Sequence, residues 1–186
     1  MNRALCAAPE RDDVPPAEPA PAPAEPSLTL RDIASFRPAS PGFTSEPSGW
    51  AVVGRPVNLL AEASATTRTG TLLGRPVDVA FTPVAFEWSA STGKRLVTEA
   101  AGRSWRELGV PELSSTDTSL RLERPGRVTV ALTVRYAAEY RFAGSVWRSI
   151  PGTLAVDAGE RELLVGTFDT VLTDGDCRAN PDGPGC

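Results

Sequence analysis

The sequence contains no histidine among its 186 residues. Histidine is the commonest general base and a frequent metal ligand in proteins. Its absence excludes Ser-His-Asp and Cys-His nucleophilic machinery and removes most kinds of zinc site. We therefore expect a protein that is not an enzyme, with no cofactor and no metal site.

Lysine is nearly missing as well, because Lys94 is the only one in the chain. The other basic residues are arginines, which are scattered rather than clustered, and the net charge is −4. Binding to nucleic acid depends on clustered positive charge that releases counterions from the phosphate backbone. The composition therefore predicts no nucleic-acid partner.

Long apolar runs are also lacking, since no stretch reaches the roughly 18 residues that a membrane-spanning helix needs. We expect no transmembrane segment in this chain. Residues 1–8 lack the apolar segment of an export signal. The protein is therefore expected to be cytosolic, or to have a signal that lies upstream of Met1.

Cysteine is rare, with Cys6, Cys177 and Cys186 and no C-x-x-C pair. Two prolines and two glycines between Cys177 and Cys186 favour a compact turn, so we predict a disulfide between these two residues. Such a bond persists only in an oxidising compartment, which indicates a secreted or cell-surface protein. Three unrelated thiols in a cytosolic protein are the alternative. Cys6 is expected to be free, to pair between chains or to be absent from the mature protein, and the sequence leaves open whether it is a lipidation site.

Composition divides the chain into four parts. Residues 1–27 are rich in proline and alanine and are expected to be a disordered, extended arm, either a stalk or an unselected tail. Residues 28–48 carry apolar Leu30, Ile33 and Phe36 and are predicted to pack on the domain as a short segment. The domain itself is assigned to residues 49–172, and residues 173–186 form a cysteine-containing tail.

The domain region alternates apolar and other residues with the period of β-strands that have one buried face. The clearest run covers residues 128–136, and similar runs cover residues 57–63, 77–81 and 84–88. Shorter strands are expected at residues 141–142, 146–150, 153–156 and 163–168, separated by turns such as Pro151-Gly152. Residues 104–109 are expected to form one helical turn. The pattern predicts an all-β sandwich.

Two segments resemble the PKD (polycystic kidney disease-type) family. Residues 86–93 resemble its Y-x-W-x-F-G-D-G segment through Trp88 and Gly93, and residues 118–134 resemble its T-x-H-x-Y-x-x-P-G-x-Y-x-V-x-L-x-V segment through the Pro125-Gly126 turn and the strand after it. The resemblance covers residues 50–136 and implies a PKD/immunoglobulin-like β-sandwich. More loosely, the domain is similar to exported actinobacterial proteins with a PKD-like core. Thr92 stands where the family's turn has aspartate, so the resemblance concerns the fold rather than a ligand.

Aromatic and acidic side chains are the remaining candidates for a site. We predict that Trp88 belongs to the core, because it shares the phase of Phe86. Trp105 and Trp147 lie in or near loops and are candidates for surface recognition, with packing at the domain edge as the alternative.

The acidic residues suggest one catalytic alternative. Glu139 with Glu87 or Glu160 has the residue types of a paired-carboxylate hydrolase site, although salt bridges to arginine are the simpler interpretation.

These features indicate a non-catalytic extracellular or cell-envelope module that serves in adhesion, as a scaffold or as an accessory domain. Its expected partner is another envelope protein or a glycan. A carbohydrate- or cell-wall-binding module is the alternative, and a carboxylate-dependent hydrolase is the third hypothesis. The sequence does not indicate an oligomeric state.

Overall fold

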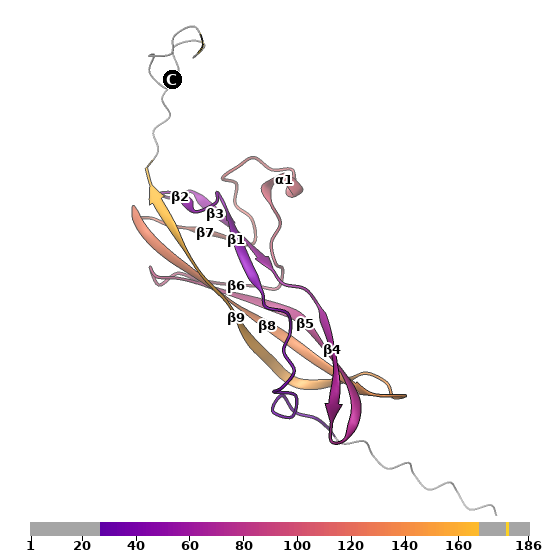
Figure 1. Cartoon of the computed structure of the whole chain (residues 1–186). Coiled ribbons are helices and arrows are strands. Elements are labelled where there is room, and N and C mark those ends of the chain that lie inside the picture. The colour runs from indigo at the N-terminus through magenta and orange to yellow at the C-terminus, as the bar shows by residue number, and fades with distance from the viewer. Residues whose placement is uncertain (1–26, 168–177, 179–186) are drawn as a thin grey trace, which may run out of the picture.

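The computed structural model describes residues 27–167 and Arg178 (Figure 1). This part of the chain contains nine strands and one helix of four residues, so the all-β prediction is confirmed. In chain order the elements are β1 (Gly42–Glu46), β2 (Trp50–Val52), β3 (Pro56–Glu62), β4 (Thr66–Leu72), β5 (Arg75–Ala90), β6 (Arg95–Thr98), α1 (Trp105–Leu108), β7 (Ser119–Arg121), β8 (Gly126–Phe142) and β9 (Arg148–Gly166).

Three long strands form the frame of the molecule. β5, β8 and β9 have 16, 17 and 19 residues, and they lie side by side as antiparallel neighbours. They belong to a six-stranded sheet of order β2-β9-β8-β5-β4, in which β6 also pairs with β5. Figure 1 shows that the three strands run almost the whole length of an elongated domain. We call the end with α1 and β2 the upper end, and the end with the β4–β5 and β8–β9 turns the lower end.

A second sheet, of order β1-β3-β7, covers the upper half of the long sheet. The two sheets meet face to face, because the ring of Phe43 on β1 packs edge-on against Trp88 on β5, with ring centroids 5.4 Å apart. Trp88 is fully buried, which confirms its predicted place in the core. The upper half is thus a two-layer structure with a shared apolar centre.

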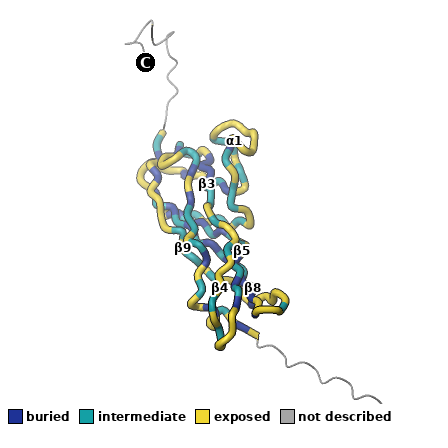
Figure 2. Tube along the Cα trace, turned by 45° about the vertical axis from the view of Figure 1, so that its right-hand side comes forward, coloured by how far each residue is buried: buried dark blue, intermediate teal, exposed yellow. Residues whose placement is uncertain are grey.

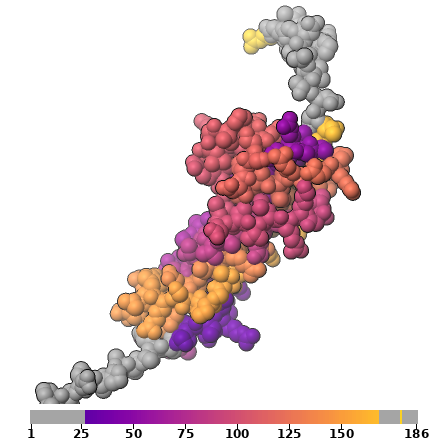
Figure 3. Space-filling model, turned by 180° about the vertical axis from the view of Figure 1, so that it is seen from behind, coloured from indigo at the N-terminus to yellow at the C-terminus, as the bar shows by residue number. Residues whose placement is uncertain are grey.

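The lower half of the same sheet face is covered by the segment that precedes β1. Leu28 and Ile33 are buried in the core, and Leu30 and Phe36 pack against it. The Phe36 ring lies so close to Gly70 on β4 that a Cβ at Gly70 would stand 2.8 Å from it. Figure 3, seen from behind, shows this indigo segment at the lower end beside the orange residues of the β8–β9 turn. Residues 42–46 of the predicted packing segment are themselves a strand, β1, and pair with β3.

The two strands predicted at residues 77–81 and 84–88 are one continuous strand, β5, which contains a bulge. The register with β8 shifts between Pro83 and Ala85, so the buried positions change from Val77, Val79 and Phe81 to Phe86 and Trp88. Proline has no amide hydrogen for a sheet and is tolerated at bulges. The prediction that Val84 shares the buried face of Trp88 is wrong, because Val84 lies in the bulge and is exposed.

The predicted strands at residues 146–150, 153–156 and 163–168 are likewise combined in one strand, β9, which covers only Arg148–Gly166. Val146 and Trp147 lie in the turn before it, and Phe168 lies outside the described residues. The Pro151-Gly152 pair does not form the predicted turn. It lies in an irregularity opposite Ala137, and Gly159 lies in a second one. Gly152 and Gly159 have φ values of 91° and 85°, which L side chains rarely adopt. Proline and glycine here bend a continuous strand.

β3 is buried on both faces, against the simple alternation expected from its sequence. Asn58 has no exposed surface, and its amide group donates to Oε2 of Glu46 at 3.0 Å and to the carbonyl of Arg103 at 2.9 Å. Its amide oxygen accepts from the hydroxyls of Thr116 and Thr118 at 2.6 and 3.0 Å. The long loop of residues 99–118 therefore covers the outer face of the small sheet and is held there through Asn58.

The central position of Trp88 gives a test of this packing. Trp88→Ala is expected to lower the free energy of unfolding by about 3–5 kcal/mol, the usual cost of truncating a large core aromatic. Trp147→Ala, at an exposed tryptophan, is the matched control and should change it by about 0.5 kcal/mol or less. Urea unfolding followed by circular dichroism measures both, and equal effects would contradict the described packing.

Candidate functional site: the open face of the long sheet

On one face of the six-stranded sheet the described part of the chain places no second layer, and polar side chains of β4, β5, β8 and β9 lie there. Successive side chains of a strand point to opposite faces, so these residues alternate with the core residues. Figure 2 shows the alternation as buried and more exposed stretches along the strands. We call this the open face. Its polar residues form cross-strand contacts that connect all four strands.

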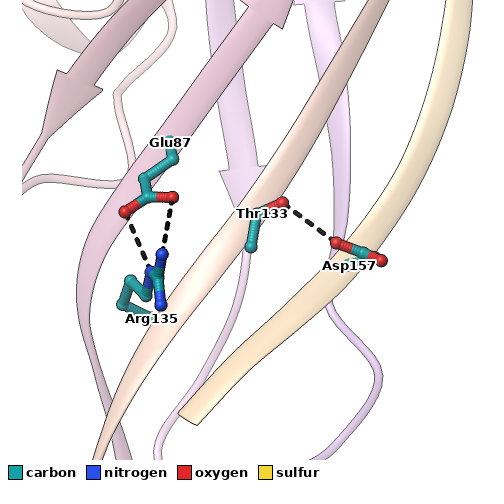
Figure 4. A network of polar contacts seen from close by, with 4 residues as sticks. All are labelled: Glu87, Thr133, Arg135 and Asp157. Atoms are coloured by element: carbon teal, nitrogen blue, oxygen red, sulfur yellow. Dashed lines mark hydrogen bonds and ion pairs between the residues drawn. The ribbon is translucent and has the colours of Figure 1, made fainter. Parts of the chain in front are cut away.

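The middle of the open face is occupied by two such contacts (Figure 4). Arg135 on β8 donates from Nε and Nη2 to the two carboxylate oxygens of Glu87 on β5, at 2.9 and 3.2 Å. This bidentate contact, and secondly the charge of Glu87, raises the pKa of Arg135. On the other side of β8, the Thr133 hydroxyl donates to Oδ1 of Asp157 on β9 at 2.9 Å.

Nearer the lower end, Asp78 is the centre of another contact chain. Its carboxylate accepts from the Thr69 hydroxyl at 2.7 Å and from Nε of Arg141 at 3.0 Å. These contacts lower the pKa of Asp78, the hydrogen bond from Thr69 first and that from Arg141 second. The guanidinium of Arg141 also lies over the Trp147 ring, 4.7 Å from its centroid. A carboxylate held in its ionised form is unsuited to act as a general acid.

The carboxylates suggested as a hydrolase pair lie on this face but not together. In the register of β5 and β8, Glu87 lies opposite Thr133 and Glu139 lies opposite Ala80. Ala80 and Glu87 are seven positions apart along β5. At about 3.3 Å per residue, roughly 20 Å separates Glu87 from Glu139, whereas glycosidase carboxylates lie about 5–9.5 Å apart. Glu160 lies on β9 opposite Ala131, two strand spacings or roughly 10 Å from β5. The sheet therefore does not assemble the suggested pair of Glu87 and Glu139.

A shallow depression of about 440 Å³, which the sequence alone does not indicate, lies near the upper part of the open face. Small side chains form its floor, among them Ser89 and Ala131, while Arg95 and Glu160 stand at opposite sides. Among the described residues, the side chains of Arg95 and Glu160 have no hydrogen bond or ion pair. Small residues at alternate positions of neighbouring strands are the signal that indicates such a trough, but it appears only once the register is known.

The two tryptophans suggested for surface recognition have different positions. Trp105 is only 5% exposed, and its Nε1 donates to the carbonyl of Ser114 at 2.9 Å. It begins α1, the predicted helical turn, which is confirmed with a capping box of Ser104 and Glu107. Surface recognition by Trp105 is therefore wrong, because its side chain is used to hold the loop of residues 99–118.

Trp147 is 38% exposed and remains accessible. The other exposed tryptophan, Trp50, pairs with Leu164 at the upper end of β9, whereas Trp147 precedes Arg148 at its lower end. Trp88 and Trp105 are buried. The four tryptophans therefore do not form one row of exposed rings, which is the arrangement expected of a sugar-binding platform.

The remaining predicted site concerns the termini. Cys177 and Cys186, the predicted disulfide, and Cys6 lie outside the described residues. Within the described part of the chain, no group of three or more His, Cys, Asp or Glu side chains is placed to hold a metal ion. No helix described there is long and apolar enough to cross a bilayer.

Comparison of the chain with models of known protein families, with curated proteins and with solved structures finds no match.

The hydrogen bonds of Asp78 predict a dependence of stability on pH. The pKa of this carboxyl is below its ordinary 3.8 in the folded protein, so the unfolded chain binds the proton more readily. The stabilisation is present above about pH 4 and is lost as the pH falls through the lowered folded value. The urea midpoint of the unmodified protein should fall between neutral and strongly acidic pH. In Asp78→Asn this fall should be smaller.

Thr69→Val is the matched variant, since it keeps the carboxylate and removes the contact with the largest effect on the pKa of Asp78. It should reduce the acid sensitivity in the same direction. If both variants kept the full pH dependence of the unmodified protein, the proposed role of Asp78 would be contradicted.

Proposed function

We propose that this chain is a non-catalytic spacer and scaffold module of a cell envelope, which holds apart the segments joined to its two ends. One observation carries the proposal. The described chain begins at Ser27 at the lower end and leaves the domain after β9 at the upper end (Figure 1). A domain with this arrangement adds its full length to whatever precedes and follows it.

The direction of the long strands supports a spacer that resists extension. β8 forms 13 residue pairs with β5 and 13 with β9, and all three strands run between the two ends. A force applied between the ends acts along β9, so it loads many interstrand hydrogen bonds together. By contrast, a force across the strands at one end loads them one after another.

The non-catalytic part of the proposal is supported by the state of the open face. Its carboxylates at Asp78, Glu87 and Asp157 are occupied by hydrogen bonds from threonine or arginine. Such contacts stabilise a sheet rather than prepare an acid and a base for proton transfer. The lack of histidine in the sequence agrees with this interpretation.

The proposal includes a PKD/immunoglobulin-like identity for the upper, two-layer half, supported by the buried Trp88 and by the start of β8 at Gly126. It also places the module outside the cytoplasm, with Cys177 and Cys186 joined. Its partner would be another envelope protein or a glycan, contacted through loops, sheet edges and the open face.

Single-molecule extension tests the spacer function. We expect the full chain, pulled through its two ends, to unfold at a higher force than the same chain pulled between Arg124 and its C-terminal end. Arg124 precedes β8, and Gly126 pairs with Val165, so the second geometry opens the β8–β9 ladder from one end. Equal or reversed forces would contradict a spacer built to bear load. Hydrolysis of peptidoglycan or polysaccharide that is lost in Glu87→Gln would contradict its non-catalytic nature.

A further inference from the structure

The lower end of the domain consists of two neighbouring hairpin turns. Residues 73–74 join β4 to β5, and residues 143–147 join β8 to β9. The backbone amide of Ala143 donates to the carbonyl of Pro76 at 3.4 Å, so the second turn lies beside the start of β5. Figure 2 shows both turns as exposed. We call residues 73–76 and 143–148 the lower tip.

Three large apolar side chains are exposed on the lower tip. Leu73 is 66% exposed, Val146 is 73% exposed and Trp147 is 38% exposed. Single apolar residues on a surface are ordinary, but several gathered on adjoining turns mark an interaction surface. The two turns project from the end of the molecule, so this surface is convex.

Leu73 occupies a position that its residue type does not favour. Its φ is 51° and that of Gly74 is 72°, both positive as in the two-residue turns that close many hairpins. Asparagine, aspartate and glycine accept this conformation, whereas leucine has no local hydrogen bond to offset its steric strain. The conformation of the turn therefore does not account for a leucine at position 73. Packing in the core does not account for it either, because the Leu73 side chain is exposed.

Among the described residues, the segments at the lower end carry a net positive charge, although the whole chain has a net charge of −4. Residues 27–41, 66–80 and 138–153 carry six arginines against three carboxylates. The arginines are Arg31, Arg37, Arg68, Arg75, Arg141 and Arg148. Two of them lie against rings of the tip region: Arg141 over Trp147, and Arg75 4.2 Å from the centroid of Phe142.

We infer that the lower tip docks on an anionic lipid surface. Leu73 and Val146 would enter the acyl-chain boundary, and Trp147 would lie at the level of the headgroups, where an apolar ring with one polar atom is favoured. The arginines around the tip would contact lipid phosphates, which guanidinium groups bind through paired hydrogen bonds. A convex apolar tip fits a fluid bilayer surface, which forms around it, better than a rigid protein surface that would need a matching cavity.

This inference goes beyond the spacer function and does not rest on it. A domain that bears no load would still bind lipid through this tip, and a spacer with an inert tip would still resist extension. Loss of either property therefore leaves the other measurable.

Co-sedimentation of the full chain with vesicles tests the proposal. We expect binding to vesicles of phosphatidylcholine that contain phosphatidylglycerol, weaker binding to pure phosphatidylcholine, and a decrease of binding as salt is raised. Leu73→Asn and Trp147→Ala should each weaken binding by about tenfold or more, the factor associated with burial of a large apolar side chain.

The variants separate docking from folding. Asparagine tolerates positive φ, so Leu73→Asn should keep or raise the thermal midpoint while it weakens binding. Val97 on β6 is also 66% exposed, and Val97→Asn is the matched control that should bind vesicles like the unmodified chain. If one tip variant failed to fold, circular dichroism would show it and the other tip variant would decide.

Four results would overturn the proposal. The first is equal binding to both kinds of vesicle, or binding to neither. The second is unchanged binding in both folded tip variants, and the third is an equal loss in Val97→Asn. The fourth is self-association in analytical ultracentrifugation that Leu73→Asn abolishes without any vesicle binding, which would assign the tip to a second copy of this chain.

Discussion

The long antiparallel ladder of β5, β8 and β9 is the constraint on which the rest of the structure depends. β8 buries every even-numbered residue from Val128 to Phe142 without interruption. Its neighbours keep their apolar residues on the same face only by means of bulges, at Pro83 in β5 and at Gly159 in β9. A one-residue shift turns every later side chain to the other face, so a regular strand in place of either bulge would expose part of the core.

The same apolar face is covered in two different ways along its length. The small sheet β1-β3-β7 covers the upper half, and the segment with Leu28 and Ile33 covers the lower half. The described residues leave the other face open, and cross-strand contacts such as the bidentate pair of Glu87 and Arg135 stabilise it. An elongated sheet covered on one side, with chain connections at opposite ends, suits a spacer whose ends and open face make contacts.

Sequence alternation predicted the class of fold and which face of β8 is buried, because residues 128–136 keep one period throughout. It wrongly divided β5 and β9 into several short strands. Proline and glycine occur both in turns and in bulges, and only the pairing with the partner strand decides between the two. For a related reason the sequence did not indicate the burial of Asn58 and left Trp105 open between surface recognition and packing. The loop of residues 99–118 contains Trp105 and covers Asn58. It is held by contacts between residues far apart in the chain, from the Asn58 amide to the Arg103 carbonyl and from the Trp105 backbone amide to Glu46. Leu73 and Trp147 lie at the same end of the molecule because of the pairing register of the long strands. No local sequence pattern specifies that register.

The spacer function depends on the upper and lower halves of the molecule forming one continuous, stiff unit. The most direct measurement is the distance between spin labels at Ala143 and Arg124, which lie beyond the two ends of β8, in a chain whose native cysteines are replaced by serine. With labels just beyond the ends of this 17-residue strand, at about 3.2 Å per residue, a single narrow distribution at about 60 Å is expected. A broad distribution, or two separate ones, would show that the halves move about the bulges and would contradict the account.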